Sequence, residues 1–383
     1  MPATQDYLFA GQGFGEFGQH FARSGFDQNL YRPFIDGRGQ LSCIVNMGSI
    51  ANPKLEKHSV KDLRDAGFPV VNAATTLRKD DWIRFDNRLR EVAKPRLRAW
   101  TDLAGASSMS GFDGYSAYTH EREAISSGGR AYVDMDGMTE GQGDNPLFLL
   151  DSTPLPITHS SFWMPKRTIE VSRAKGTPLS TRQLTSCTER VTETVERTLI
   201  GTLTGMTFGT DSRHRRDSRV WGYLNFPDRM TLNTMTTPNS GGWTGNTLVT
   251  EVLTMIDNLA ATGKYGPFML YHSTDFSQIM GNDYSYTGGN HSHMTVAQRL
   301  RGIDEIRDVR RLDFLPAATN PWTIVLVEMS ENTAVAIEGM PLRVLQWESH
   351  GGEKIHFKVM TIMVPELASD YNGSCGIGVM TTS

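Results

Sequence analysis

Three groups of residues in this sequence have types and spacing that could support chemistry. Residues 13–18 read GFGEFG and match the GxGxxG pattern of dinucleotide sites, but no strand–helix–strand unit follows, so we interpret them as a flexible arm. His291 and His293 form an HxH pair that could bind a metal; the spacing supplies no third ligand, which favours ordinary polar loop histidines. Asp134 and Asp136 could be a catalytic or calcium-binding pair, but on an exposed strand we expect them to be solvated.

No complete catalytic motif accompanies these groups. Gly263-Lys264 is followed by Tyr265 rather than Ser or Thr, so it does not form a phosphate-binding loop. Neither a GxSxG nucleophile elbow nor an HExxH zinc motif occurs. We therefore expect a protein that is not an enzyme and that carries no cofactor or metal.

The composition sets the broad class. The chain has 383 residues, 38% of them hydrophobic and 21% charged, which is typical of a soluble globular protein of about two or three domains. No apolar run is long enough to span a membrane. The three cysteines are widely spaced and predict reduced thiols. Net charge is −4, yet residues 78–98 carry eight Lys or Arg against four Asp or Glu, a local excess that either faces a polyanion or lies on a solvated amphipathic helix.

The first half of the chain predicts an arm, a helix and a hairpin. Residues 1–76 sustain neither helical nor strand periodicity, which indicates an extended arm. A helix is expected over 77–103, kinked by Pro95. Residues 127–138 and 147–165 read as the two strands of a long hairpin with a loose tip at 141–146. Because an isolated hairpin is marginal in water, we expect a neighbouring subunit to support it.

The clearest helix follows, and then an α/β region. The helix is predicted over 178–200, with Thr177 as N-cap and Gly201 as its C-terminal stop. Its apolar positions form one stripe: Leu184, Cys187, Val191, Val195 and Leu199. Helices and strands then alternate up to about residue 339. The last part reads as a hairpin that turns at Gly351-Gly352.

The central block resembles a known family. The motifs that carry the resemblance, in chain order, are Leu155-Pro156-Ile157-Thr158-His159, Phe162, Arg167, Ser172-Arg173, Gly176-Thr177-Pro178-Leu179-Ser180-Thr181, the helix with Val191, Glu193 and Glu196, Gly222-Tyr223, Asn225, Pro227, Gln346-Trp347-Glu348 and Phe357-Lys358-Val359-Met360. In this order they resemble encapsulin-like major capsid proteins of tailed bacteriophages, which have the Hong Kong 97-type capsid fold. The resemblance covers about residues 120–380 and rests on packing and turn residues.

The resemblance implies an α+β fold with a set order of parts. These are an N-terminal arm (1–76), a helix and connector (77–118), an extended loop hairpin (119–165), a peripheral domain (166–240 and 340–383) with a long spine helix (178–200), and an α/β axial domain (241–339). The implied function is a major capsid protein that self-assembles into the icosahedral or prolate shell around the double-stranded DNA of a tailed phage. An encapsulin-type compartment that encloses an enzyme is the alternative.

Two departures from the family narrow these expectations. Some members begin with a scaffolding segment that a protease removes; here arm and helix account for residues 1–118, so we expect no cleaved scaffold. The type member cross-links its shell through a lysine of the extended loop, whereas no lysine occurs from His120 to Pro165. We therefore expect a shell held together by non-covalent contacts or by a cement protein.

Candidate contact residues between subunits are charged. Arg130, Arg167 and Arg173 could pair with acidic residues of another subunit, and the sequence offers Asp134, Asp136 and Glu140 for this role. For any single residue, a solvated surface charge worth less than about 1 kcal/mol is the simpler interpretation. The implied partners are copies of the chain in pentamers and hexamers, a portal protein, non-specifically packaged DNA and, as an option, a cement protein, without a membrane. The implied location is the virion capsid, assembled in the bacterial host cytoplasm.

Overall fold

The structure is a computed structural model in which two compact units can be described. It describes residues 34–35, 41–46, 55–59, 79–93, 97–110, 114–126, 131, 133–136, 138, 145, 147–175, 181–203, 207–209, 214–238, 244–285, 291–316 and 322–382. Unit 1 comprises residues 1–92, 160–188 and 343–359; unit 2 comprises residues 93–159, 189–342 and 360–383. The chain therefore passes between the units several times.

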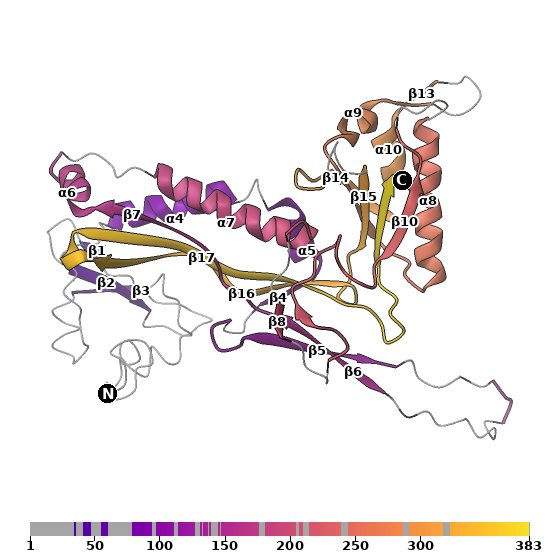
Figure 1. The fold of residues 1–383 in the computed structure, drawn as a ribbon, viewed down its shortest axis with the longest axis horizontal. Helices are drawn as coiled ribbons and strands as arrows, with labels where there is room; N and C mark the ends of the chain where they lie inside the picture. Colours follow the sequence, from indigo (N-terminus) through magenta and orange to yellow (C-terminus); the bar gives the residue numbers. More distant parts are fainter. Residues whose placement is uncertain are drawn as a thin grey trace. The chain divides into compact units, whose positions relative to one another are not determined.

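In unit 1, helix α4 (Lys79–Ala93) covers one face of strand β17 (Lys354–Leu367), as Figure 1 shows. The ring of Phe85 on α4 is fully buried and meets the ring of Phe357 at 5.7 Å. Phe162 of β7 (Thr158–Pro165) stacks on the same ring at 5.0 Å. β17 lies between β7 and β16 (Ala334–Ser349) in a sheet of order β4-β16-β17-β7, where β4 is Ser108–Ser110.

The N-terminal part of unit 1 differs from our expectation. We expected an extended arm without sustained periodicity over residues 1–76; within it, β1 (Phe34–Ile35), β2 (Leu41–Asn46) and β3 (Leu55–Ser59) form a three-stranded antiparallel sheet. The strands are two, six and five residues long. Alternation over so few positions is too short to stand out in a sequence. The GFGEFG segment lies outside the described residues.

Helix α7 (Arg182–Ile200) confirms the predicted helix from residue 182 onward, while Thr177 and Pro178 lie outside the described residues. The five residues of the predicted apolar stripe are all buried, with exposed fractions of 8% or less. Gly201 ends the helix with φ +89°, a left-handed conformation that glycine adopts without strain. Helix α6 (Lys166–Ala174) comes earlier in the chain.

The predicted single helix over 77–103 is two helices. α4 ends at Ala93, and α5 (Arg98–Ala106) begins after Leu97, whose φ of −93° and ψ of 62° are not helical. Pro95 lies between them, and a proline removes a backbone donor and clashes with the preceding turn. A kink was predicted, and the structure has a break.

Unit 2 contains a five-stranded sheet buried on both faces. Its order is β10-β18-β15-β11-β14. The strands are β10 (Met230–Met235), β11 (Phe268–His272), β14 (Ile306–Arg311), β15 (Thr323–Glu328) and β18 (Ile377–Thr382). Every residue of β11 and β15 is buried. Strands covered on both sides read as continuous apolar runs, which is how FMLYH and TIVLV appear in the sequence.

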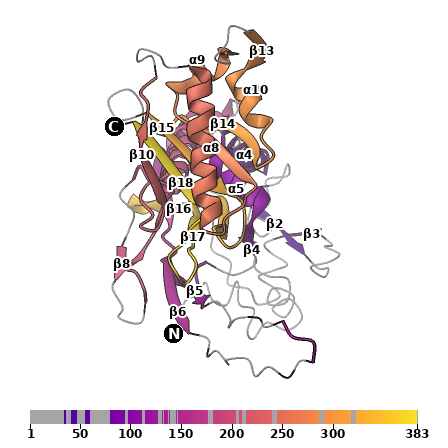
Figure 2. The ribbon, with the colours of Figure 1, turned by 90° about the vertical axis from the view of Figure 1, so that its right-hand side faces the viewer.

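Separate sets of elements cover the two faces of this sheet. On one face, α8 (Gly245–Ala261), α9 (Phe276–Gly281) and α10 (Val296–Arg301) contribute to a cluster with Leu270, Ile324 and Leu326. Figure 2 shows α8 running in front of β10 and β18. On the other face, α5 and the end of α7 pack with Tyr271 and Val325. The short strands β12 (Asp283–Ser285) and β13 (His291–Thr295) pair beside α10.

The hairpin exists, and its return strand lies within the predicted range 147–165, but its outgoing strand is not where we predicted it. β5 (Thr119–Ile125) pairs with β6 (Phe148–Pro154) from Thr119↔Pro154 to Ile125↔Phe148. The outgoing strand thus precedes residues 127–138, and the described residues 133–136 are irregular. The return run also divides, because β7 joins the β16–β17 sheet instead. Pro154 and Pro156 lie at this division and cannot donate to a continuing ladder.

The closing hairpin agrees with the sequence. β16 and β17 are joined by the short helix η1 (His350–Gly352), and Gly351 and Gly352 have φ of +66° and +91°.

Cys187 and Cys375 are buried free thiols, as expected. In the described part of the chain, no helix is both long and apolar enough to cross a membrane.

Candidate functional site

Of the six predicted contact residues, the structure describes the side chains of three. Asp134 and Asp136 lie beyond β5 and are exposed, on irregular backbone rather than on the strand we predicted. Arg167 is exposed on the first turn of α6. Arg130 and Glu140 lie outside the described residues, and Arg173 lies on α6 without a described side chain. The contacts expected of these residues stay predictions.

The hairpin carries apolar side chains that nothing in the described chain covers. Val133, Met135 and Met138 are exposed to 101%, 99% and 85%, beyond the paired strands. Ile125 and Phe148 form the last pair of the β5–β6 ladder and are more than half exposed. Contiguous exposed apolar residues of this kind mark interaction surfaces. The contact residues predicted in this segment were its charges and did not include these apolar residues, although Val133 and Met135 alternate with acidic residues in the sequence.

Backbone and hydroxyl contacts attach the base of the hairpin to the rest of unit 2. The N–H of Leu155 donates to the Tyr118 carbonyl at 2.8 Å and closes the open end of the ladder. The N–H of Arg215 donates to the Leu150 carbonyl of β6 at 2.9 Å. The buried hydroxyls of Ser152 and Ser218, the latter on β9 (Ser218–Arg219), lie 3.1 Å apart. Strand β6 is therefore tied to residues 214–219; β9 itself pairs with β8 (Thr207–Gly209).

Two arginines and two aspartates meet beside this attachment, and with Ser369 we call them the base cluster. The guanidinium groups of Arg215 and Arg216 lie 3.0 and 2.5 Å from Asp228 and 3.7 and 3.9 Å from Asp151 of β6. Both arginines also donate to the Ser369 hydroxyl, which donates to Asp228 at 2.6 Å. Their side chains are only 17% and 12% exposed, so solvent screens the cluster weakly.

Neighbouring groups extend the base cluster. Burial raises the pKa of Asp151, and Arg215 opposes that rise. Lys264 reaches Asp370 at 2.9 Å, and Arg215 donates to the Asp370 carbonyl at 2.9 Å. On β5, the ring of His120 lies 3.0 Å from the buried carboxylate of Glu366, whose hydrogen bond raises the pKa of the histidine. Both strands of the hairpin are thus joined to the body by ionic contacts.

A second exposed surface lies on unit 1. Because Phe357 faces α4, strand alternation places Lys354 and His356 on the opposite face of β17. There the ammonium group of Lys354 lies 4.8 Å from the ring centre of Trp163, and Trp347 stacks on His356 at 5.0 Å. Both tryptophans remain close to half exposed. We call these four residues the aromatic face; Trp347 belongs to a motif noted in the sequence, but its pairing with His356 was not predicted.

Within the described residues, no group of three or more His, Cys, Asp or Glu could hold a metal ion. His291 and His293 fall on β13, without described side chains.

The fold has known counterparts among solved structures. The capsid of Myoviridae phage XM1 matches with a TM-score of 0.54 and 12% identity, over 73% of this chain and 90% of that chain. The capsid of a native GTA particle matches with a TM-score of 0.50 and 12% identity, over 75% and 91%. These likenesses show a Hong Kong 97-like capsid fold of mixed α and β elements.

The family can be stated as well. Residues 72–380 match DUF6260, a family of unknown function, and the chain belongs to this family. No curated protein matches the sequence.

Proposed function

We propose that this chain is a major capsid protein, which self-assembles into the shell around the double-stranded DNA genome of a tailed phage. The observation that carries the proposal is a hairpin with uncovered apolar residues on a chain with a Hong Kong 97-like fold. Val133, Met135 and Met138 would be costly to leave in water on a permanent monomer. A neighbouring copy that covers them removes that cost.

The parts of the chain take roles accordingly. Residues 1–76 are the N-terminal arm, 77–118 its helix and connector, and 119–165 the extended loop that overlaps a neighbour. Residues 166–240 and 340–383 are the peripheral domain, with α7 as spine helix, and 241–339 are the axial domain around fivefold and sixfold axes. The buried stripe of α7 and the double-faced sheet of unit 2 support these roles, because both make rigid bodies suited to repeated packing.

Contacts between copies use several modest surfaces. The hairpin, the aromatic face and exposed charges such as Arg167 each contribute a contact, and closed symmetry multiplies them. Weak individual contacts also let misplaced subunits dissociate during assembly. The portal protein, packaged DNA and, as an option, a cement protein are further partners, and assembly takes place in the bacterial host cytoplasm.

A compartment of the encapsulin type is the alternative function for the same fold. The two capsid neighbours described above, a phage and a gene-transfer particle, favour the viral role. Genes for a portal protein and a terminase beside this one would support it, whereas an adjacent gene for a ferritin-like or peroxidase cargo would reverse the choice.

Electron microscopy of the expressed full-length chain tests the proposal. Closed shells, or pentamers and hexamers, are expected at micromolar concentration. A monodisperse small oligomer that does not assemble on concentration or in crowding agents would overturn it.

A further inference from the structure

The direction in which the hairpin leaves unit 2 needs a physical cause. Two paired strands alone are marginal in water and cannot hold themselves in one direction. The outer pair, Ile125 and Phe148, is more than half exposed, so apolar packing does not hold that end. The contacts that set the direction of the hairpin must therefore lie at its base, where it joins the rest of unit 2.

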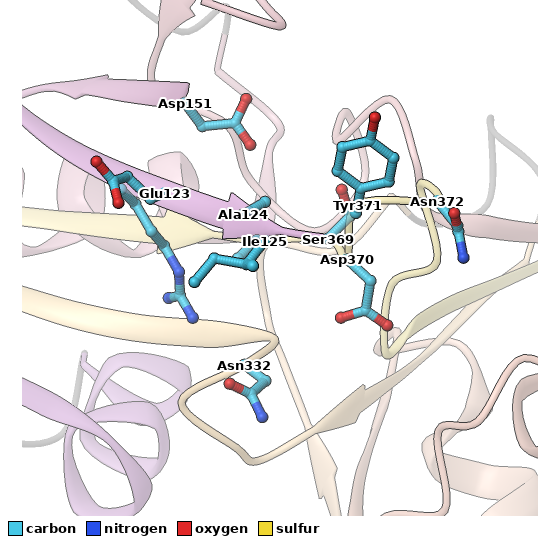
Figure 3. A pocket seen from close by; sticks show the side chains of 11 residues that line it. Glu123, Ala124, Ile125, Asp151, Asn332, Ser369, Asp370, Tyr371 and Asn372 are labelled. Carbon is cyan, nitrogen blue, oxygen red and sulfur yellow. The ribbon is translucent and has the colours of Figure 1, made fainter. Parts of the chain in front are cut away.

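A cavity separates part of the hairpin from the body at this point. It has a volume of about 410 Å³. On the hairpin side it is lined by Arg122, Glu123, Ala124, Ile125 and Asp151, and on the body side by Asn332 and residues 368–372 (Figure 3). Open space rather than close packing lies between the two, so the hairpin has room to change its angle.

The base cluster bridges the hairpin and the body beside this cavity. Asp151 belongs to β6, and Ser369 lies on the loop that follows β17. Arg215 and Arg216 contact both, and the backbone of Arg215 also bonds β6 directly. Asp228 holds the two guanidinium groups in place, and the guanidinium carbon of Arg216 lies 4.6 Å from the centre of the Phe226 ring.

We propose that the base cluster is a latch: Arg215 and Arg216 are positioning residues that fix the direction of the hairpin by joining Asp151 of β6 to Asp228 and Ser369 of the body. The two guanidinium groups and the two carboxylates carry equal and opposite charge, so the latch buries no net charge. Planar guanidinium groups suit it because each can engage several oxygens at once, which a lysine ammonium does less well. In assembly, which rests on the proposed function, the latch presents the hairpin to its neighbour in one orientation.

Hydrogen exchange on the dilute full-length chain tests the latch without requiring shells. In Arg216→Gln, amides of β5 and β6 should exchange about tenfold faster, the effect expected from losing one charge-assisted contact. Amides of β11 and β15 should stay within about twofold of the wild type, because the sheet core does not depend on the latch. In Arg216→Lys, the exchange rate of the β5 and β6 amides should fall between those of the wild type and Arg216→Gln.

Two further variants keep the test decisive. Arg301→Gln on α10 removes an exposed ion pair with Asp308 of β14. It should leave the hydrogen exchange of the hairpin amides unchanged. Asp228→Asn should repeat the effect of Arg216→Gln, and the double variant should add little to either, because both remove the same interaction. Unchanged hairpin exchange in Arg216→Gln, or an equal rise throughout unit 2, would overturn the latch.

Assembly of the same variants separates the latch from the proposed function. If wild-type chain forms shells, Arg216→Gln should lower their yield or change their size, while Arg301→Gln should not. If the wild type never assembles, the capsid function fails, yet the exchange result still decides whether the latch exists.

Discussion

The carboxylate of Glu196 on α7 accepts the backbone N–H of Ala99, at the start of α5, at 2.7 Å. It also accepts the N–H of Trp100 at 3.2 Å. Helix starts leave such donors without an intrahelical partner, and Leu97 in the N-cap position supplies no side-chain cap. A residue of another helix therefore caps α5. Burial raises the pKa of Glu196 to about 7, and the nearby Asp102 adds to the rise.

This geometry predicts a stability that falls as pH rises. The pKa of Glu196 is about 7 in the folded chain and near 4.5 when unfolded, so the unfolded chain releases this proton first. The contribution of Glu196 is fully present below about pH 4.5 and is lost as the pH rises through about 7. Urea unfolding at pH 5, 6.5 and 8 should show the wild type losing on the order of 3 kcal/mol from this group.

Glu196→Gln should flatten that dependence, because glutamine does not titrate. Glu193→Gln, which removes a half-buried carboxylate from the same helix, is the matched control for the loss of one negative charge. An identical slope in Glu196→Gln and the wild type would show that another group is responsible.

A pair of glycines predicts opposite effects of the same substitution. A Cβ on Gly222 would lie 2.4 Å from the Gly201 nitrogen and the Thr198 oxygen, both backbone atoms at the end of α7. A Cβ on Gly105, an exposed residue of α5, meets nothing within 4 Å. Gly222→Ala should lower the free energy of unfolding by about 2 kcal/mol or more, and Gly105→Ala should raise it by roughly 0.5–1 kcal/mol. Thermal denaturation checks both, and equal effects would contradict this account.

Polar replacement of the hairpin residues should affect assembly alone. Met135 is 99% exposed, so Met135→Ser should leave the melting temperature of the unassembled chain within about 1 °C. Particle yield on a sucrose gradient should fall several-fold if a neighbour covers this residue. Tyr265→Ser, at a 72% exposed site on the loop after α8, is the control. Equal particle yields from Met135→Ser and Tyr265→Ser would show that Met135 makes no contact between subunits.

Arg167 tests the charged contacts. Arg167→Ala should lower capsid yield without unfolding the chain, since the side chain is exposed on α6. Arg182→Ala removes another exposed arginine, at the start of α7, and serves as the comparison. Circular dichroism should show that each variant is folded, and negative-stain particle counts should give the yield. A normal capsid yield from Arg167→Ala would show that Arg167 is only a solvated surface charge and makes no contact that assembly needs.

The absence of lysine between His120 and Pro165 predicts an uncross-linked shell. An amide bond from the extended loop needs a primary amine there, and the first candidate, Lys166, lies at the start of α6. Particles boiled in detergent should therefore run as monomers of 42.6 kDa on a denaturing gel. A ladder of covalent pentamers and hexamers would show that another chemistry joins the subunits.

Elements that depend on near neighbours in the chain were predictable. The stripe of α7, the end of α8 before Gly263, and the turn at Gly351-Gly352 follow from residues a few positions apart. The capping of α10 by Thr295 is equally local, with its hydroxyl accepting from Gln298 at 3.2 Å. The strands of the hairpin were not predictable in the same way. The polar alternation of residues 119–125 resembles a loop until its partner Phe148–Pro154 is seen.

The sequence by itself determined the helices with a clear apolar stripe, the glycine turns and, through its motifs, the fold family, because helical stripes, caps and glycine turns are set by local chemistry. Only the tertiary structure decided which charges meet. Arg215 and Ser369 are 154 positions apart, and Glu196 and Ala99 are 97 apart. Neither pairing has a signature along the chain, since it arises from packing α5, α7 and the sheet of unit 2 around shared apolar clusters. The latch and the cap are therefore products of the fold.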